Sequence, residues 1–199
     1  MRGRRGRRPC CCAAKQKFSK QGLFKQGWEK LYPGMIDYHN LDNDGVVARI
    51  DAANMTLHTD FGEYKGDVIN FIPPQHAARI AKDSGLTDAT GWCPVDHLTF
   101  ESTLVPGVHV IGDASVAAPM PKSGFAASTQ GKVCAAAIAA IVGGGRPGTP
   151  KFVITCYSLV APDYGISVAM VYGYKDGKIV KVDGSGELSP MDVPDFDRK

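Results

Sequence analysis

Alternating apolar and polar positions predict a chain that mixes helices with short strands, an α/β arrangement. Apolar residues recur at close to helical spacing in 18–32, and the Pro-Gly pair that follows ends this helix. Segments 46–50 and 55–59 alternate between apolar and polar residues on either side of a four-residue loop, which is typical of a β-hairpin. A further β-rich run covers 67–72, and a short helix is expected over 76–84.

The most informative pattern lies in the middle of the chain. Residues 108–111 are rich in valine and isoleucine, which predicts a short buried strand that ends at Gly112. An Ala-rich helix should run from about 124 to 141, with Ser123 as its N-cap and a run of glycines as its stop. The sequence therefore predicts a strand, a loop and a capped helix in succession.

The C-terminal quarter is predicted to be β-structure. A strand is expected over 151–158, and 165–174 should pair with 178–182 as a hairpin. The longest unbroken apolar run, 133–142, has ten residues, whereas a helix that spans a membrane needs about twenty. We therefore expect a buried helix at this position and no membrane span.

Composition and charge narrow the class of protein. With 44% hydrophobic and 22% charged residues, the 199-residue chain has the composition of a folded globular protein. The formal net charge is +3, but five arginines in the first eight residues contribute more positive charge than this total. The rest of the chain is therefore slightly acidic, and no nucleic-acid partner is expected. The six cysteines include no C-x-x-C pair and the five histidines are scattered, so no metal site is expected.

The loop between the predicted strand and helix carries the candidate chemistry. Asp113 at a strand tip accepts hydrogen bonds from hydroxyls, such as those of a ribityl or ribose chain, and Gly112 allows close approach of the backbone. Pro121 prevents an earlier helix start. The first helical turn beginning at Gly124 can stabilise a phosphate or an anionic ring through its N–H groups and the helix dipole. The alternative is an ordinary loop and capped helix without a ligand.

Several motifs resemble those of one flavoprotein family. The G-D pair at 112–113 resembles the end of a late strand in flavoproteins with two dinucleotide-binding domains. The motifs M-P-K-S-G-F at 120–125, Q-G-K at 130–132 and T-C-Y-S-L-V-A-P-D-Y-G-I-S at 155–167 resemble the flavoprotein subunit of flavocytochrome c sulfide dehydrogenase. This subunit belongs to the superfamily of FAD-dependent pyridine nucleotide-disulfide oxidoreductases. The resemblance extends from about residue 17 almost to the end.

The resemblance implies a fold and a division into domains. It implies the C-terminal half of such a flavoprotein, with an incomplete Rossmann-like FAD domain and an α+β interface domain. On this basis 18–74 is a remnant of the second dinucleotide-like domain, 75–148 is the C-terminal part of the FAD-binding domain, and 149–199 is a truncated interface domain. The arginine-rich segment 1–17 has too short an apolar stretch for a signal peptide. It is expected to be a disordered leader, with a nucleic-acid-binding arm as the alternative.

The resemblance also implies a function. Sulfide is oxidised to sulfur or polysulfide, and the electrons pass through FAD to a c-type cytochrome subunit in the periplasm. Cys156 would be one half of a redox disulfide, and its usual partner would lie upstream of Met1. The residues implied to bind the cofactor are Gly112, Asp113, Pro121, Lys122, Ser123 and Gly124.

Part of the family pattern is missing from the chain. The glycine-rich run at 143–145 ends a helix, whereas the fingerprint that binds a dinucleotide pyrophosphate follows a strand and opens a helix. We therefore expect an incomplete FAD site, and a chain that purifies without flavin colour. Two alternatives stay open: a truncated non-catalytic piece or interaction module, and a related FAD or NAD(P)H disulfide oxidoreductase.

Overall fold

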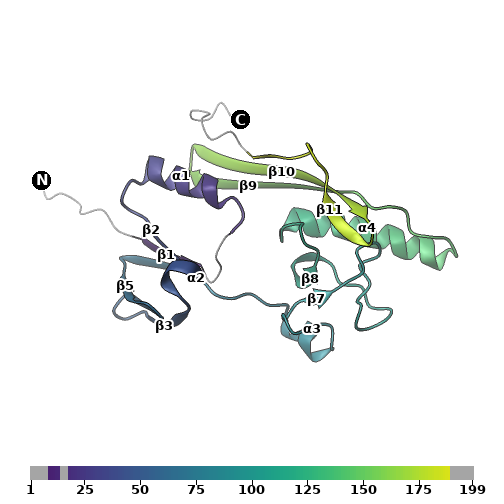
Figure 1. Cartoon of the computed structure of the whole chain (residues 1–199), viewed down its shortest axis with the longest axis horizontal. Coiled ribbons are helices and arrows are strands. Elements are labelled where there is room, and N and C mark those ends of the chain that lie inside the picture. Colours follow the sequence, from purple (N-terminus) through teal and green to yellow (C-terminus); the bar gives the residue numbers. More distant parts are fainter. Residues whose placement is uncertain (1–8, 14–17, 189–199) are drawn as a thin grey trace, which may run out of the picture. The chain divides into compact units, whose positions relative to one another are not determined.

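The structure is a computed structural model that describes residues 9–13 and 18–188 (Figure 1). The described chain divides into two compact units. Unit 1 takes in the residues up to Gln75 together with Leu159–Gly165, and unit 2 takes in His76–Ser158 and the residues from Ile166 onward. Each unit has its own hydrophobic core.

Unit 1 contains a three-stranded parallel sheet. Strand β1 (Pro9–Ala13) lies in the middle and pairs with β2 (Asp37–Asn40) on one side and β6 (Val68–Ile72) on the other. This strand corrects the prediction of a disordered leader over 1–17; the other leader residues lie outside the described chain. The run P-C-C-C-A is too short for a signal sequence, but it is long and apolar enough for a strand inside a sheet.

Helix α1 (Gln21–Leu31) confirms the first predicted helix, with a later start. It packs against the turn at 159–165. Gly27 is buried there, and a Cβ added to it would lie only 3.0 Å from Cγ1 of Val160. The hydroxyl of Tyr32 donates a hydrogen bond of 3.0 Å to the carbonyl oxygen of Val160. The small residue therefore allows the helix to approach this turn closely.

The predicted hairpin is confirmed as β3 (Val47–Asp51) and β4 (Thr56–Thr59), which pair in antiparallel fashion. A short strand that the sequence pattern did not indicate, β5 (Glu63–Lys65), adds to β4. Leu57 on β4 is completely buried and forms the centre of the unit 1 core. The apolar residues packed against it are Val47, Tyr64, Ile69 and Phe71.

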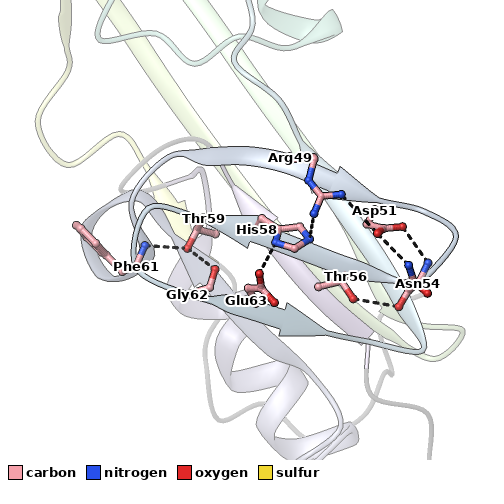
Figure 2. A network of polar contacts seen from close by, with 9 residues as sticks. All are labelled: Arg49, Asp51, Asn54, Thr56, His58, Thr59, Phe61, Gly62 and Glu63. Carbon is pink, nitrogen blue, oxygen red and sulfur yellow. Dashed lines mark hydrogen bonds and ion pairs between the residues drawn. The ribbon is translucent and has the colours of Figure 1, made fainter.

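A polar network crosses the surface of this antiparallel sheet (Figure 2). Nε2 of His58 lies 2.6 Å from Nη2 of Arg49, and its Nδ1 lies 2.8 Å from Oε1 of Glu63. Because arginine can only donate, Nε2 must accept and Nδ1 must carry the proton that is donated to Glu63. These three residues lie opposite one another on β3, β4 and β5, so the network links all three strands.

A buried polar contact closes the end of β2. Asn40 caps the short helix α2 (Leu41–Asp44) that follows directly. Nδ1 of His39 lies 3.0 Å from Oδ1 of Asp44, and the Asn40 N–H donates a hydrogen bond of 2.9 Å to Oδ2. Burial alone would raise the pKa of Asp44, but hydrogen bonds from His39, Asn40 and Tyr64 outweigh this effect and lower the pKa below the usual 3.8.

Unit 2 combines helices with a four-stranded sheet in which β10 (Tyr164–Lys175) pairs with β9 (Phe152–Ala161) and lies antiparallel to β11 (Lys178–Lys181) and β12 (Glu187–Leu188). Its core includes the fully buried rings of Phe100 and Phe152, which meet edge to face with centroids 5.9 Å apart. The predicted C-terminal strand and hairpin are confirmed. The elements are α3 (Arg79–Asp83), β7 (Cys93–Pro94), β8 (Ser115–Val116), α4 (Gly124–Val142), β9 (Phe152–Ala161), β10 (Tyr164–Lys175), β11 (Lys178–Lys181) and β12 (Glu187–Leu188).

His97 connects two of these strands through both of its ring nitrogens. Nε2 lies 2.8 Å from the carbonyl oxygen of Val116 on β8, and Nδ1 accepts a hydrogen bond of 3.1 Å from the N–H of Ile179 on β11. Nε2 must therefore carry the proton and donate it to the carbonyl. His97 is therefore a structural residue whose hydrogen-bonding capacity is satisfied.

The predicted strand over 108–111 is wrong. The segment forms an isolated bridge between His109 and Glu101, and a 3₁₀ turn over Gly112–Ala114 follows it. Val108 and Ile111 keep 37% and 43% of their surface exposed, so the segment is not the buried strand that its β-branched residues predict. The β-branched residues favour a strand here, but in the described chain the segment finds only one bridge partner.

Helix α4 confirms the predicted helix, its Ser123 N-cap and its glycine stop. Its buried residues are Ala126, Gln130, Cys134 and Ala137, whereas Val142 at its end is 82% exposed. The helix therefore buries only one side, which differs from the buried helix predicted over 133–142. Within the described chain, α4 alone has the length and apolar composition of a possible membrane span, a test that core helices of soluble proteins also pass.

Candidate functional site

The 3₁₀ turn at Gly112 is hydrogen-bonded to a side chain of α4. Gly112 has a positive φ of 74°, a conformation that glycine adopts without steric strain. Its N–H donates a hydrogen bond of 2.7 Å to Oε1 of Gln130, which is 3% exposed. A Cβ added at Gly112 would lie 3.4 Å from Cβ of Ala127, so the turn passes close to the first turn of the helix.

The start of α4 offers donors that the helix itself does not use. Oγ of Ser123 accepts a hydrogen bond of 3.2 Å from the N–H of Ala126, as the sequence predicts. The N–H groups of Gly124 and Phe125 have no partner inside the helix, because they precede the first i to i−4 bond. A Cβ added to Gly124 would meet no atom within 4 Å, so the helix start faces open space in the described chain.

Lys122 binds the loop on the other side of this turn. Its Nζ donates to the carbonyl oxygens of Asp113 and Ser115, the second at 3.1 Å. The same Nζ lies 3.7 Å from the ring centroid of Trp92, a cation–π contact. The side chain of Asp113 is exposed, as a group that accepts hydrogen bonds from a ligand must be.

A pocket of about 140 Å³ lies between these groups. Gly112, Pro121 and Lys122 line it, so three of the predicted site residues meet there; Asp113, Ser123 and Gly124 lie beside it in the sequence but do not line it. The sequence analysis named neither Trp92 nor Gln130 as a site residue, although the Q-G-K motif begins at Gln130. The full lining consists of Trp92, Gly112, Ser115, Val116, Ala117, Ala118, Met120, Pro121, Lys122 and Gln130.

Cys156 lies apart from these residues in the sequence, in the middle of the ten-residue strand β9. It is half-buried, whereas Cys93 and Cys134 are buried. Burial raises the pKa of both buried thiols, and the positive charge of Lys122 partly opposes this rise at Cys93. As one sulfur of a redox disulfide, Cys156 is predicted to lie at a strand end and outside the apolar core. The first part of this prediction is wrong, because the residue lies in the middle of β9, whereas the second part is confirmed. The side chains of the cysteines at 10–12 lie outside the described structure.

Comparison with protein families assigns two separate parts of the chain. Residues 10–73 match the central domain of the sulfide dehydrogenase [flavocytochrome c] flavoprotein chain, and residues 148–199 match the flavin-binding domain of flavocytochrome c sulphide dehydrogenase. The chain belongs to the flavocytochrome c sulfide dehydrogenase flavoprotein family. This confirms the resemblance inferred from the motifs. The first match begins inside β1, so the family pattern extends further toward the N-terminus than the sequence analysis placed it.

Two solved structures are similar in fold to this flavoprotein chain. A chain of the mitochondrial ATP synthase of Tetrahymena thermophila has a TM-score of 0.54 and 12% identity over 86% of this chain and 53% of its own. A chain of the covalent putidaredoxin reductase–putidaredoxin complex has a TM-score of 0.50 and 11% identity over 92% of this chain and 55% of its own. At these identities the likeness concerns the fold alone. The chain spans about half the length of the chains it matches.

The residues of this flavoprotein chain fit the ring end of a flavin. The open approach at Gly124 leaves room for a flat group, and the unused N–H groups of the first helical turn favour negative charge there. The remaining parts of a dinucleotide, the pyrophosphate and adenine, have no glycine-rich strand-to-helix turn to bind them in the described chain.

Proposed function

We propose that the chain is part of an FAD-dependent sulfide dehydrogenase that oxidises sulfide to sulfur or polysulfide and delivers the electrons to a c-type cytochrome subunit. The observation that carries this proposal is the arrangement at the start of α4, in a chain of this family. The turn at Gly112 is hydrogen-bonded to Gln130, and it lies beside a helix start that Ser123 caps and that is open to a ligand. By family resemblance the protein acts in the periplasm.

In this proposal the residues at the start of α4 hold the flavin ring. The N–H groups of Gly124 and Phe125 and the positive end of the helix stabilise negative charge on the ring. The exposed carboxylate of Asp113 accepts hydrogen bonds from hydroxyls of the ribityl chain. When bound, the flavin supplies the step from two-electron oxidation of sulfide to one-electron transfer to haem.

Cys156 is proposed as one sulfur of a redox disulfide. Attack by hydrosulfide breaks the S–S bond, forms a persulfide on one sulfur and releases the other as a thiolate. The half-buried position of Cys156 supports this role because a reacting sulfur must be reached by its substrate, in contrast to Cys93 and Cys134. The second sulfur is not assigned to a described residue.

The flavin site can be tested by titrating the isotopically labelled chain with FMN and following its backbone amide signals by NMR. FMN carries the ring and the ribityl phosphate, so the signals of Gly112, Gly124 and Phe125 should shift, with weak affinity because the pyrophosphate contacts are missing. ADP-ribose, which lacks the ring, serves as the matched control and should leave these signals in place. Equal shifts with ADP-ribose, or no shifts with FMN, would contradict the proposal.

A further inference from the structure

Trp92 and Lys122 make an unusually close contact. The Lys122 ammonium lies 3.7 Å from the centroid of the Trp92 ring. Three other lysine–ring pairs in the described chain, at Lys20, Lys25 and Lys30, are 5.1 to 6.0 Å apart. Tryptophan has the most favourable ring for a cation, and attraction rises as the cation approaches the face. The indole ring therefore restrains this ammonium more strongly than the other rings restrain theirs.

The ammonium is at the same time bound to the turn that carries the candidate flavin residues. Its two carbonyl partners belong to Asp113 and Ser115, which are in the 3₁₀ turn and at the start of β8. Two hydrogen bonds to these oxygens and the contact with the indole ring together fix the position of the Lys122 ammonium. The turn and Lys122 consequently hold one another in position.

Trp92 is itself anchored on the backbone. Its carbonyl oxygen accepts a hydrogen bond of 2.9 Å from the N–H of Asp88. The next residue, Cys93, is fully buried and pairs with Ser115 in the parallel β7–β8 pair. Since Ser115 is also one of the carbonyl partners of Lys122, the ring and the turn are tied to the same short sheet. The Trp92 ring that contacts Lys122 is therefore held in place by its own backbone contacts.

We propose that Trp92 is a positioning residue that holds the Lys122 ammonium on the Asp113 and Ser115 carbonyls, and so fixes the turn at Gly112 and Asp113 for a flavin. The inference rests on the proposed function in its last step, whereas the hold on Lys122 stands on geometry alone. The charge of Lys122 also acts on the Cys93 thiol, which is consistent with an ammonium held beside β7.

The hold on Lys122 can be measured without flavin, by acetylating the folded chain with an N-hydroxysuccinimide ester and quantifying each lysine by mass spectrometry. In Trp92→Leu the Lys122 amine should react about fivefold faster, because the cation–π restraint is lost. Trp92→Phe keeps a ring and should restore most of the protection. Lys132 and Lys151, which are exposed in the same unit, are internal controls whose rates should not change. An unchanged Lys122 rate in Trp92→Leu, or an equal acceleration at Lys132, would overturn the proposal.

A second measurement separates the two proposals. FMN titration of Trp92→Leu should give smaller shifts at the Gly112 amide than titration of the native chain, and Trp92→Phe should lie between them. If Trp92→Leu releases Lys122 but binds FMN as the native chain does, the positioning role is overturned while the flavin site stands. If FMN shifts no signal in any of the three proteins, the flavin site fails, and with it the last step of the inference. Acetylation still decides whether Trp92 holds Lys122.

Discussion

The backbone N–H of Gly112 donates a hydrogen bond of 2.7 Å to Oε1 of Gln130, eighteen residues further along the chain. Gln130 is almost completely buried, and its Nε2 lies 3.6 Å from the sulfur of Met120. One side chain of α4 thus satisfies a backbone donor of the turn that carries the candidate site. The turn depends on the helix for its position, so the site and the stability of unit 2 are coupled.

Replacing Gln130 by methionine should destabilise unit 2 by about 1–3 kcal/mol, because the Gly112 N–H loses its acceptor in a place with little access to water. The change preserves the length of the side chain and its helix propensity. Urea unfolding followed by Trp92 fluorescence in a Trp28→Phe background measures the loss. Lys132→Met, on an exposed position of the same helix, is the control and should change the free energy of unfolding by less than about 0.5 kcal/mol. Equal stability of the two variants would show that the Gly112 bond contributes nothing.

Substitution of Gly112 by alanine should cost about 1–2 kcal/mol of stability, because the positive φ of 74° strains any residue with a Cβ. Gly124→Ala is the matched control, since a Cβ there meets no atom within 4 Å and alanine favours the helix. Gly124→Ala should therefore be as stable as the native chain or more so, yet weaken the FMN-induced shifts if the flavin ring approaches at this residue. Thermal unfolding and FMN titration of both variants separate the two effects. Weakened FMN binding in neither variant would argue against a flavin at this helix start.

The start of α4 could be predicted from the sequence because its signals are local. Ser123 sits immediately before the helical pattern, its oxygen caps an N–H three residues away, and glycines follow the last turn. The contacts that complete the site, by contrast, join residues that are far apart in the sequence. Gly112 meets Gln130 across eighteen residues and Trp92 meets Lys122 across thirty, so which partner each residue finds is decided by the packing of the loop on the helix.

Two of the errors in strand prediction, at β1 and at 108–111, have a related cause. Among the described residues, strand β1 pairs with strands that begin at Asp37 and Val68, so nothing near it in the sequence signals a parallel sheet. The run at 108–111 has strong strand propensity, but its pairing is limited to one bridge between His109 and Glu101. Strand propensity describes a residue's fit to a sheet, and the presence of the sheet depends on residues far away.

Asp44 should make the stability of unit 1 depend on pH. Its pKa in the folded chain is lowered below 3.8, so its contribution to stability is complete above that value and is lost as the pH falls through the folded pKa. Asp44→Asn should cost about 2 kcal/mol at pH 6, where a charged acceptor is replaced by a neutral one, and the difference from the native chain should shrink as the pH approaches 2. Urea unfolding followed by Trp28 fluorescence in a Trp92→Phe background measures it. Asp42→Asn, an exposed neighbour on α2, is the control. A difference that stays constant with pH would contradict the role of the His39–Asp44 contact.

Cys156 should react with iodoacetamide faster than the two buried cysteines of unit 2 in the folded chain. Only the thiolate is nucleophilic, and burial raises the pKa of both Cys93 and Cys134, so at pH 8 each holds less thiolate and is also shielded from the reagent. The smaller thiolate fraction and the shielding both slow the two buried thiols, so we expect a clearly faster rate at Cys156 when the peptides are quantified by mass spectrometry. In concentrated guanidinium chloride the three thiols should react alike, which controls for the effect of local sequence. A thiol that hydrosulfide or a partner sulfur must reach has to be accessible, so protection of Cys156 equal to that of Cys93 and Cys134 would rule out its proposed redox role and leave it a structural residue of β9.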